Sequence, residues 1–234
     1  MENFILECCV DSVESALNAV KGGASRLELC ANLPIGGTTP DLALYHRIRK
    51  ESEIRIHALI RPRFGDFCYS DYEMDLMREQ IRMFRQEKAQ AVVIGVLNED
   101  GELNLQAMER LIQEADGMSV TLHRAFDMCR DPFQALEDAV SLGVDTILTS
   151  GQRQSAWEGR EPLAELVRKA AGRIDIMSGG GISADVIRRL RRITGGTSYH
   201  MSGKVTLQSP MRYRKAEVSM GLPSLSEYEI WQTS

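Results

Sequence analysis

The sequence alternates eight short β-rich runs with seven segments of helical periodicity, and this alternation constrains the fold more than any other feature. The β-rich runs predict strands at residues 4–10, 26–30, 55–61, 91–97, 119–126, 146–150, 175–178 and 197–202. The segments between them predict helices at residues 12–21, 41–51, 72–88, 104–115, 132–142, 162–171 and 183–193. Strict alternation of strand and helix is typical of a parallel sheet buried by helices.

Eight such units in 234 residues give about 29 residues per unit, close to the ~30 residues of a βαβ crossover. The repeat favours one α/β domain over residues 1–234, a closed (β/α)8 barrel of the TIM type. A doubly wound open sheet is the alternative, but no GxGxxG turn follows the first strand. We expect residues 204–234 to form a C-terminal extension packed on the barrel. Helix starts are indicated by Asp11 and Glu14, spaced as a capping box, and by Ser183 as an N-cap.

Composition and charge exclude several classes of protein. The net charge is −5, and no stripe of Lys or Arg marks a surface for nucleic acid. No apolar run reaches the roughly 20 residues that a membrane-spanning helix needs. The N-terminal residues lack the features of a signal peptide, so we expect a cytoplasmic location. The five cysteines are an odd number without a CxxC pair, which indicates free thiols rather than disulfides or structural zinc.

Side chains on a strand alternate between two faces, so each predicted strand assigns residues to the barrel interior. In the first strand alternate apolar residues face the helices, which turns Glu7 and Cys9 inward. In the second strand the same reasoning turns Glu28 and Cys30 inward. Cys8 then lies under a helix, as a small apolar residue in the core.

Other strands add polar residues to the predicted interior. Buried charged groups must be paired, so the set forms either a mutually satisfied network without chemistry or a functional site. Most of the set lies toward the C-terminal ends of strands, where barrel enzymes carry their sites, and this favours a site. The ionisable inward residues on strands three, five and eight are His57, Arg61, His123, Asp127 and His200.

Two glycine-containing turns predict a place for an anion. "SGGGIS" (178–183) follows the seventh strand, and "SGK" (202–204) follows the eighth. The loops after these two strands commonly hold a phosphate in such barrels. The alternative is that the glycines only permit tight turns. The candidate anion-binding residues are Gly179, Gly180, Gly181, Ser202 and Gly203.

Several long motifs resemble the CutC family of copper homeostasis proteins, from about residue 4 to residue 203. They are "ECCVDSVESALNAVKGGASRLELC", "GGTTPD", "IRPRFGDFCYS", "LHRAFDM", "ILTSG" and "MSGGGI". Phe64 departs from the family pattern, which has a second glycine before Gly65. The resemblance implies a TIM barrel, a cytoplasmic homodimer or higher homo-oligomer, and Cu(I) bound by Cys9 and Cys30. It implies no particular reaction.

Two functions therefore remain open. Cu(I) prefers thiolate ligands, and inward cysteines on strands about 4.8 Å apart fit a two-sulfur site. The alternative is an enzyme acting on a small anionic or phosphorylated metabolite, held by Arg61 and the glycine turns. A weaker possibility is a regulator that acts through its oligomer surface. The candidate acid–base residues of the enzyme are Glu7, Glu28, His123 and Asp127.

Overall fold

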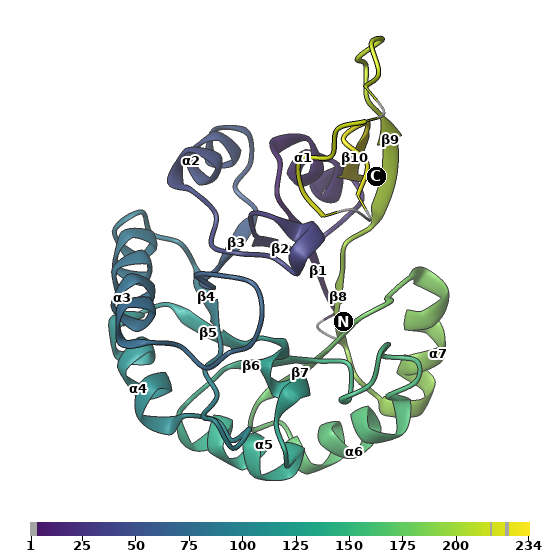
Figure 1. Cartoon of the computed structure of the whole chain (residues 1–234). Helices are drawn as coiled ribbons and strands as arrows, with labels where there is room; N and C mark the ends of the chain where they lie inside the picture. Colours follow the sequence, from purple (N-terminus) through teal and green to yellow (C-terminus); the bar gives the residue numbers. More distant parts are fainter. Residues whose placement is uncertain (1–3, 216, 223–224) are drawn as a thin grey trace.

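The computed structural model describes residues 4–215, 217–222 and 225–234. Its centre is a barrel of eight parallel strands, closed where the first strand pairs with the eighth. Helices surround the barrel on its outer side, as Figure 1 shows. The predicted closed (β/α)8 fold is confirmed, and the open doubly wound sheet is not formed.

The barrel strands are β1 Ile5–Val10, β2 Arg26–Leu29, β3 Arg55–Leu59, β4 Ala91–Ile94, β5 Ser119–Leu122, β6 Thr146–Thr149, β7 Asp175–Gly179 and β8 Ser198–Met201. Within the described residues the α-helices are α1 Val13–Lys21, α2 Leu42–Glu51, α3 Asp71–Gln86, α4 Leu105–Glu114, α5 Pro132–Ser141, α6 Arg160–Ala170 and α7 Ala184–Thr194. Two short 3-10 helices, η1 Leu33–Ile35 and η2 Arg124–Met128, lie in the loops after β2 and β5. Among the residues that the structure describes, no helix has the length and apolar composition to span a membrane.

Local capping explains where the helices begin. Ser183 caps α7 by accepting a hydrogen bond from the Val186 N–H, as predicted. At α1 the N-cap is Ser12, which accepts from the Ser15 N–H, so the predicted capping box starting at Asp11 is wrong. The Asp11 carboxylate instead accepts from the Leu33 N–H in the next loop.

The core has two parts because the barrel wall has two faces. The large outer part lies between strands and helices, and Cys8 belongs to it, as its position in the strand predicts. A small inner cluster lies inside the barrel and consists of Cys9, Cys30, Leu59 and Val93. The rest of the interior is polar to an unusual degree for a fold commonly filled by branched apolar side chains.

The fifth strand ends earlier than its sequence predicts. It stops at Leu122, and the predicted strand residues up to 126 begin the 3-10 helix η2 instead. The reason is local, because the His123 side chain caps η2 by accepting from the Ala125 N–H. Gly95, just after β4, leaves room for that ring, since a Cβ there would lie 2.5 Å from His123 Cε1.

After β8 the described chain forms an antiparallel hairpin, β9 Lys204–Gln208 and β10 Glu229–Thr233, instead of a further helix. The hairpin lies beside α1 (Figure 1). Asn18 Nδ2 of α1 donates to the Thr233 carbonyl, and the Thr233 N–H donates to Ser15 Oγ. These bonds bring the end of the chain to the rim of the barrel.

Candidate functional site

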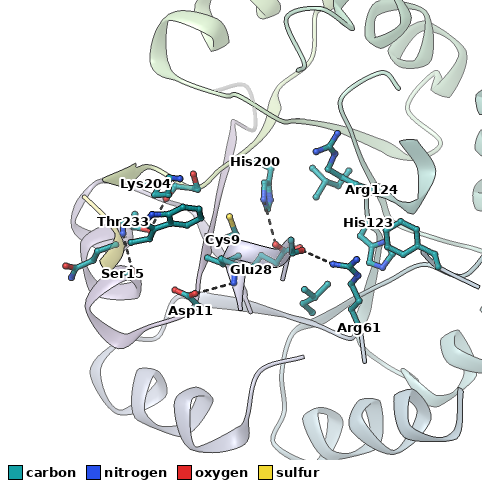
Figure 2. A pocket seen from close by; sticks show the side chains of 18 residues that line it. Cys9, Asp11, Ser15, Glu28, Arg61, His123, Arg124, His200, Lys204 and Thr233 are labelled. Atoms are coloured by element: carbon teal, nitrogen blue, oxygen red, sulfur yellow. Dashed lines mark hydrogen bonds and ion pairs between the residues drawn. The ribbon is translucent and has the colours of Figure 1, made fainter. Parts of the chain in front are cut away.

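A cavity of about 320 Å³ opens at the C-terminal ends of the barrel strands. We call it the mouth pocket (Figure 2). Strands β1, β2, β3, β6 and β8, the loops after β1, β2, β3, β5 and β8, helix α1 and the C-terminal hairpin all contribute residues to it. Its lining residues are Cys9, Asp11, Ser15, Glu28, Leu33, Gly36, Leu59, Arg61, Phe67, His123, Arg124, Leu148, His200, Ser202, Lys204, Trp231, Gln232 and Thr233.

Three potential ligand groups meet in this pocket. One ligand atom each of Cys9, Glu28 and His200 lies within 4.8 Å of the other two. Strand β1 lies between β2 and β8, with Cys9 opposite Glu28 in one register and Glu7 opposite His200 in the other. The trio therefore exists only because the barrel closes. Figure 2 shows its three side chains directed toward one another.

Glu7 lies behind this trio and does not line the pocket. It has no exposed surface, and its Oε2 accepts from Arg26 Nε at 2.6 Å, while Oε1 lies 2.8 Å from His200 Nδ1. His57 Nδ1 is 3.5 Å from the same carboxylate. Burial alone would raise the pKa of Glu7, but the hydrogen bond to His200 and the charge of Arg26 lower it to about 2.

His200 is held in its charged form by the acids around it. Burial alone would lower its pKa, yet Cys9, Glu28 and Glu7 raise it well above its ordinary value. Its Nε2 lies 3.7 Å from Glu28 Oε2. Burial raises the pKa of Glu28 as well, against the lowering effect of His200. The pair can therefore hold a proton between an imidazole and a carboxylate at the pocket floor.

Cys30 is fully buried beside the trio. Its Sγ donates to Glu28 Oε2 at 3.3 Å. Burial and the nearby Glu28 carboxylate raise the pKa of Cys30 well above its ordinary value, so it remains a thiol. Of the two cysteines assigned to copper from the sequence, Cys9 belongs to the trio and Cys30 supports Glu28 from behind.

Arg61 and His123 form the opposite wall of the pocket. The Arg61 guanidinium donates to the carbonyls of Gly36, Gly37 and Gly65 and lies 5.1 Å from the centre of the Phe67 ring. Burial and the charge of Arg61 lower the pKa of His123 to about 3, so this imidazole is neutral.

Asp127 lies elsewhere than its sequence position predicts. It belongs to η2 rather than to an inward strand position, and it does not line the mouth pocket. Its carboxylate accepts from Thr149 Oγ1 at 2.5 Å and from the Ser150 N–H, which fixes the loop after β6. Asp127 Oδ2 also accepts from Arg124 Nε at 2.7 Å, so it positions an arginine that does line the pocket.

The predicted anion-binding residues separate into two places. Ser202 lines the mouth pocket, and the next residue, Gly203, accepts from the Ser234 N–H through its carbonyl. Gly179, Gly180 and Gly181 lie outside the pocket lining, where the Gly180 carbonyl accepts from the Ala156 N–H. Gly180 and Gly181 have φ values of 91° and 70°, a conformation that favours glycine.

Sequence reasoning did not assign site roles to Arg26, Arg124, Lys204 or Trp231. Arg26 shares strand parity with Glu28, so alternation could have found it. Lys204 and Trp231 carry no local signal, because only the folded hairpin brings them to the pocket. His200 was predicted to face inward, but its meeting with Cys9 depends on the pairing of β8 with β1.

Comparisons with known proteins identify the family of the chain. The model of the CutC family matches residues 4–205. The chain is 42% identical over 228 residues to a family protein CutC from Histophilus somni, covering 97% of this chain and 93% of the relative. It is equally 42% identical over 228 residues to the human "Copper homeostasis protein cutC homolog", covering 97% of this chain and 84% of that protein.

Among solved structures, the crystal structure of CutC from Streptococcus agalactiae superposes with a TM-score of 0.81 at 30% identity. The match covers 85% of this chain and 98% of the streptococcal chain. Family model, relatives and fold coincide over the barrel that carries the mouth pocket, and the chain belongs to the CutC family.

Proposed function

We propose that this protein acts in copper homeostasis by binding Cu(I) at the floor of the mouth pocket, with Cys9 and His200 as ligands. The observation that carries the proposal is the meeting of Cys9, Glu28 and His200 within 4.8 Å. Thiolate and imidazole are donors that suit copper, whereas a carboxylate suits harder metal ions. The name of the human relative supports the same metal.

The surrounding residues fit such a site. Glu7 accepts from His200 Nδ1, which leaves Nε2 facing Cys9 and Glu28. A carboxylate behind a ligating histidine commonly orients the ring in this way. Copper ligation requires the Cys9 thiol and the His200 Nε2 to give up their protons, and Glu28 is placed to accept one of them. Cys30 is the alternative second sulfur that the sequence suggested.

Anaerobic Cu(I) titration against a coloured chelator tests the proposal. We expect one tightly bound ion, lost in Cys9→Ser and in His200→Asn. Cys30→Ser distinguishes the two ligand sets, because it should retain the complex if His200 is the second ligand. Cys129→Ser is the matched control, since this buried thiol donates to the Ala125 carbonyl outside the pocket. Unchanged affinity in both Cys9→Ser and His200→Asn contradicts the site.

A second candidate function is an enzyme acting on a small anionic metabolite. The observation that favours it is that Arg61, Arg124 and Lys204 line the same pocket, although a single metal ion needs none of them. In this function Glu28 and His200 exchange protons with the substrate, and Glu7 holds His200 in place. His123, being neutral, offers a hydrogen bond rather than a charge.

A crystallographic experiment tests where the anionic group of the substrate binds. Crystals grown in phosphate should show the ion in the mouth pocket, against Arg61 and Arg124, or at the 179–181 turn outside that pocket. Density at the first place makes the mouth pocket the substrate site. Density at neither place argues against an anionic substrate.

A further inference from the structure

Arg61 is a buried cation for which the described residues provide no carboxylate. It is 7% exposed, its Nη1 and Nη2 donate to the backbone carbonyls of the glycines named above, and its buried Nε has no hydrogen-bond partner. A buried charge is costly unless it is paired or coordinates a charged group. Because Arg61 lines the mouth pocket, a ligand can supply the missing anion.

Lys204 is an exposed residue of the C-terminal hairpin, and it brings a second positive charge to the same pocket. Its ammonium lies 3.3 Å from the centre of the Trp231 ring and forms no ion pair within the described chain. Both residues line the mouth pocket. In Figure 2, Lys204 lies on one side of the pocket and Arg61 and Arg124 on the other, with Glu28 and His200 between them.

The acidic groups of the pocket do not neutralise these two cations. Asp11 accepts from the Leu33 N–H, and Glu28 accepts from the Cys30 thiol and faces His200. Arg124, by contrast, is already paired with Asp127 at 2.7 Å. Two positive charges on opposite walls thus remain without a carboxylate partner in the described residues.

The walls between the charges are apolar. Leu33, Leu59, Phe67, Leu148 and Trp231 face the cavity. Its volume of about 320 Å³ lies at the lower end of the range for small-molecule sites. A metal ion at the floor would leave most of this volume unused, together with the cations Arg61 and Lys204 on its walls.

We propose that the mouth pocket binds a small organic dianion whose two anionic groups are joined by a short apolar chain. One anionic group pairs with Arg61, the other pairs with Lys204, and the chain lies against Trp231. The C-terminal hairpin is then a recognition element for the ligand. This inference deepens the second candidate function, since it names the class of molecule that the pocket accepts.

Calorimetric titration of the unmodified chain with glutarate tests the inference in the absence of copper. We expect saturable binding that is at least tenfold tighter than binding of pentanoate, which has one carboxylate. Neutral glutaramide should bind more weakly than either. A parallel titration with 3-phosphopropanoate shows whether the pocket prefers a phosphorus oxyanion to a carboxylate as the second anionic group. Tighter binding of either dianion than of pentanoate supports the inference.

Lys204→Met identifies the wall that holds the second anionic group. The variant should bind glutarate about as weakly as pentanoate, while its affinity for pentanoate stays unchanged because Arg61 is intact. Lys169→Met is the matched control, since Lys169 lies 4.6 Å from the centre of the Phe133 ring, outside the mouth pocket. It should bind both ligands as the unmodified chain does.

Tryptophan fluorescence locates the ligand independently. The chain has two tryptophans, so a Trp157→Phe variant reports on Trp231 alone. Glutarate should change the Trp231 fluorescence with the same saturation curve as the heat measured by calorimetry.

Equal binding of glutarate and glutaramide, or a Lys204→Met variant that binds glutarate as tightly as the unmodified chain, overturns the inference. Neither result bears on the proposed copper ligands or on proton transfer by Glu28 and His200. Binding of the dianion without any turnover would instead contradict the enzyme function and leave the inference about the ligand intact.

Discussion

Glu7 has no exposed surface and contacts three basic side chains, Arg26, His57 and His200. Its two oxygens have different partners. Oε2 accepts from Arg26 and balances its charge, and Oε1 holds the His200 ring through Nδ1. The carboxylate is therefore a positioning residue for the pocket floor rather than a group that touches a ligand. Removing its charge leaves two buried basic groups without their main partner.

We expect Glu7→Gln to lower the free energy of unfolding by about 3–5 kcal/mol, the usual cost of removing one partner from a buried ion pair. Urea unfolding followed by circular dichroism measures the change. Glu137→Gln is the matched control, because Glu137 pairs with Arg173 on the surface and such pairs contribute little. Equal stability of the two variants would show that Glu7 is not the centre of the interior network.

At the scale of elements, neighbouring helices are joined by charge as well as by apolar contact. Glu114 at the end of α4 accepts from both Arg78 and Arg82 of α3, and α3 buries Met77 and Ile81 against the barrel. The hydrogen bond from Arg82 is the largest cause that lowers the pKa of Glu114 to about 2; burial opposes it, and the hydrogen bond from Arg78 adds to the lowering.

This depressed pKa predicts a direction for the pH dependence of stability. A carboxylate whose pKa is lowered by folding stabilises the protein above its unfolded pKa of about 4.5, and loses that contribution as the pH falls toward 2. Glu114→Gln should cost less than about 1 kcal/mol at pH 7, because the arginines are partly exposed. Urea unfolding at pH 7 and pH 3 should show the difference from the unmodified chain shrinking at the lower pH. A difference that grows contradicts this origin.

At the scale of the whole molecule, barrel closure and the C-terminal hairpin build the pocket together. Closure pairs β8 with β1 and brings His200 to Cys9. The hairpin adds Lys204 and Trp231 from the other end of the chain. It is attached to α1 by hydrogen bonds that include Thr233 N–H to Ser15 Oγ. A segment held this way is expected to open separately from the barrel.

We expect Ser15→Ala to increase hydrogen exchange in β10 while the barrel strands keep their protection. The lost hydrogen bond contributes on the order of 1 kcal/mol, enough for roughly fivefold faster local exchange. Hydrogen exchange followed by mass spectrometry resolves the segments. Ser25→Ala is the control, because Ser25 Oγ accepts from the Leu6 N–H and should affect the start of β1 instead. Uniform acceleration across the chain would mean that the hairpin and barrel open as one unit.

Much of this fold could be predicted from periodicity alone. Alternating strands and helices predict the barrel, and the seven helices begin and end within two residues of their predicted bounds. Strand parity predicts that Cys8 faces the helices and that Cys9 and Cys30 lie in the inner cluster. These predictions succeed because each depends on a repeat of two or 3.6 residues along one element.

Asp127 shows where such reasoning ends. Extending the fifth strand to residue 126 turned this residue inward, but the His123 side chain caps η2 and ends the strand alternation. A single hydrogen bond between a side chain and the backbone is enough to end the strand. The alternation of apolar and polar residues does not predict such a bond. The capping box expected at Asp11 failed for the same kind of reason, since Ser12 offers the nearer oxygen.

The sequence by itself determined which face of each strand is polar, and therefore that Glu7, Cys9 and Glu28 share the interior. The tertiary structure alone decided which of these groups meet, because closure of the barrel sets the neighbours of β1. It also decided that Lys204 and Trp231 reach the pocket, through a hairpin whose two strands are distant in the chain. Periodicity fixes the direction of a side chain, whereas contact between distant segments depends on how the whole chain packs.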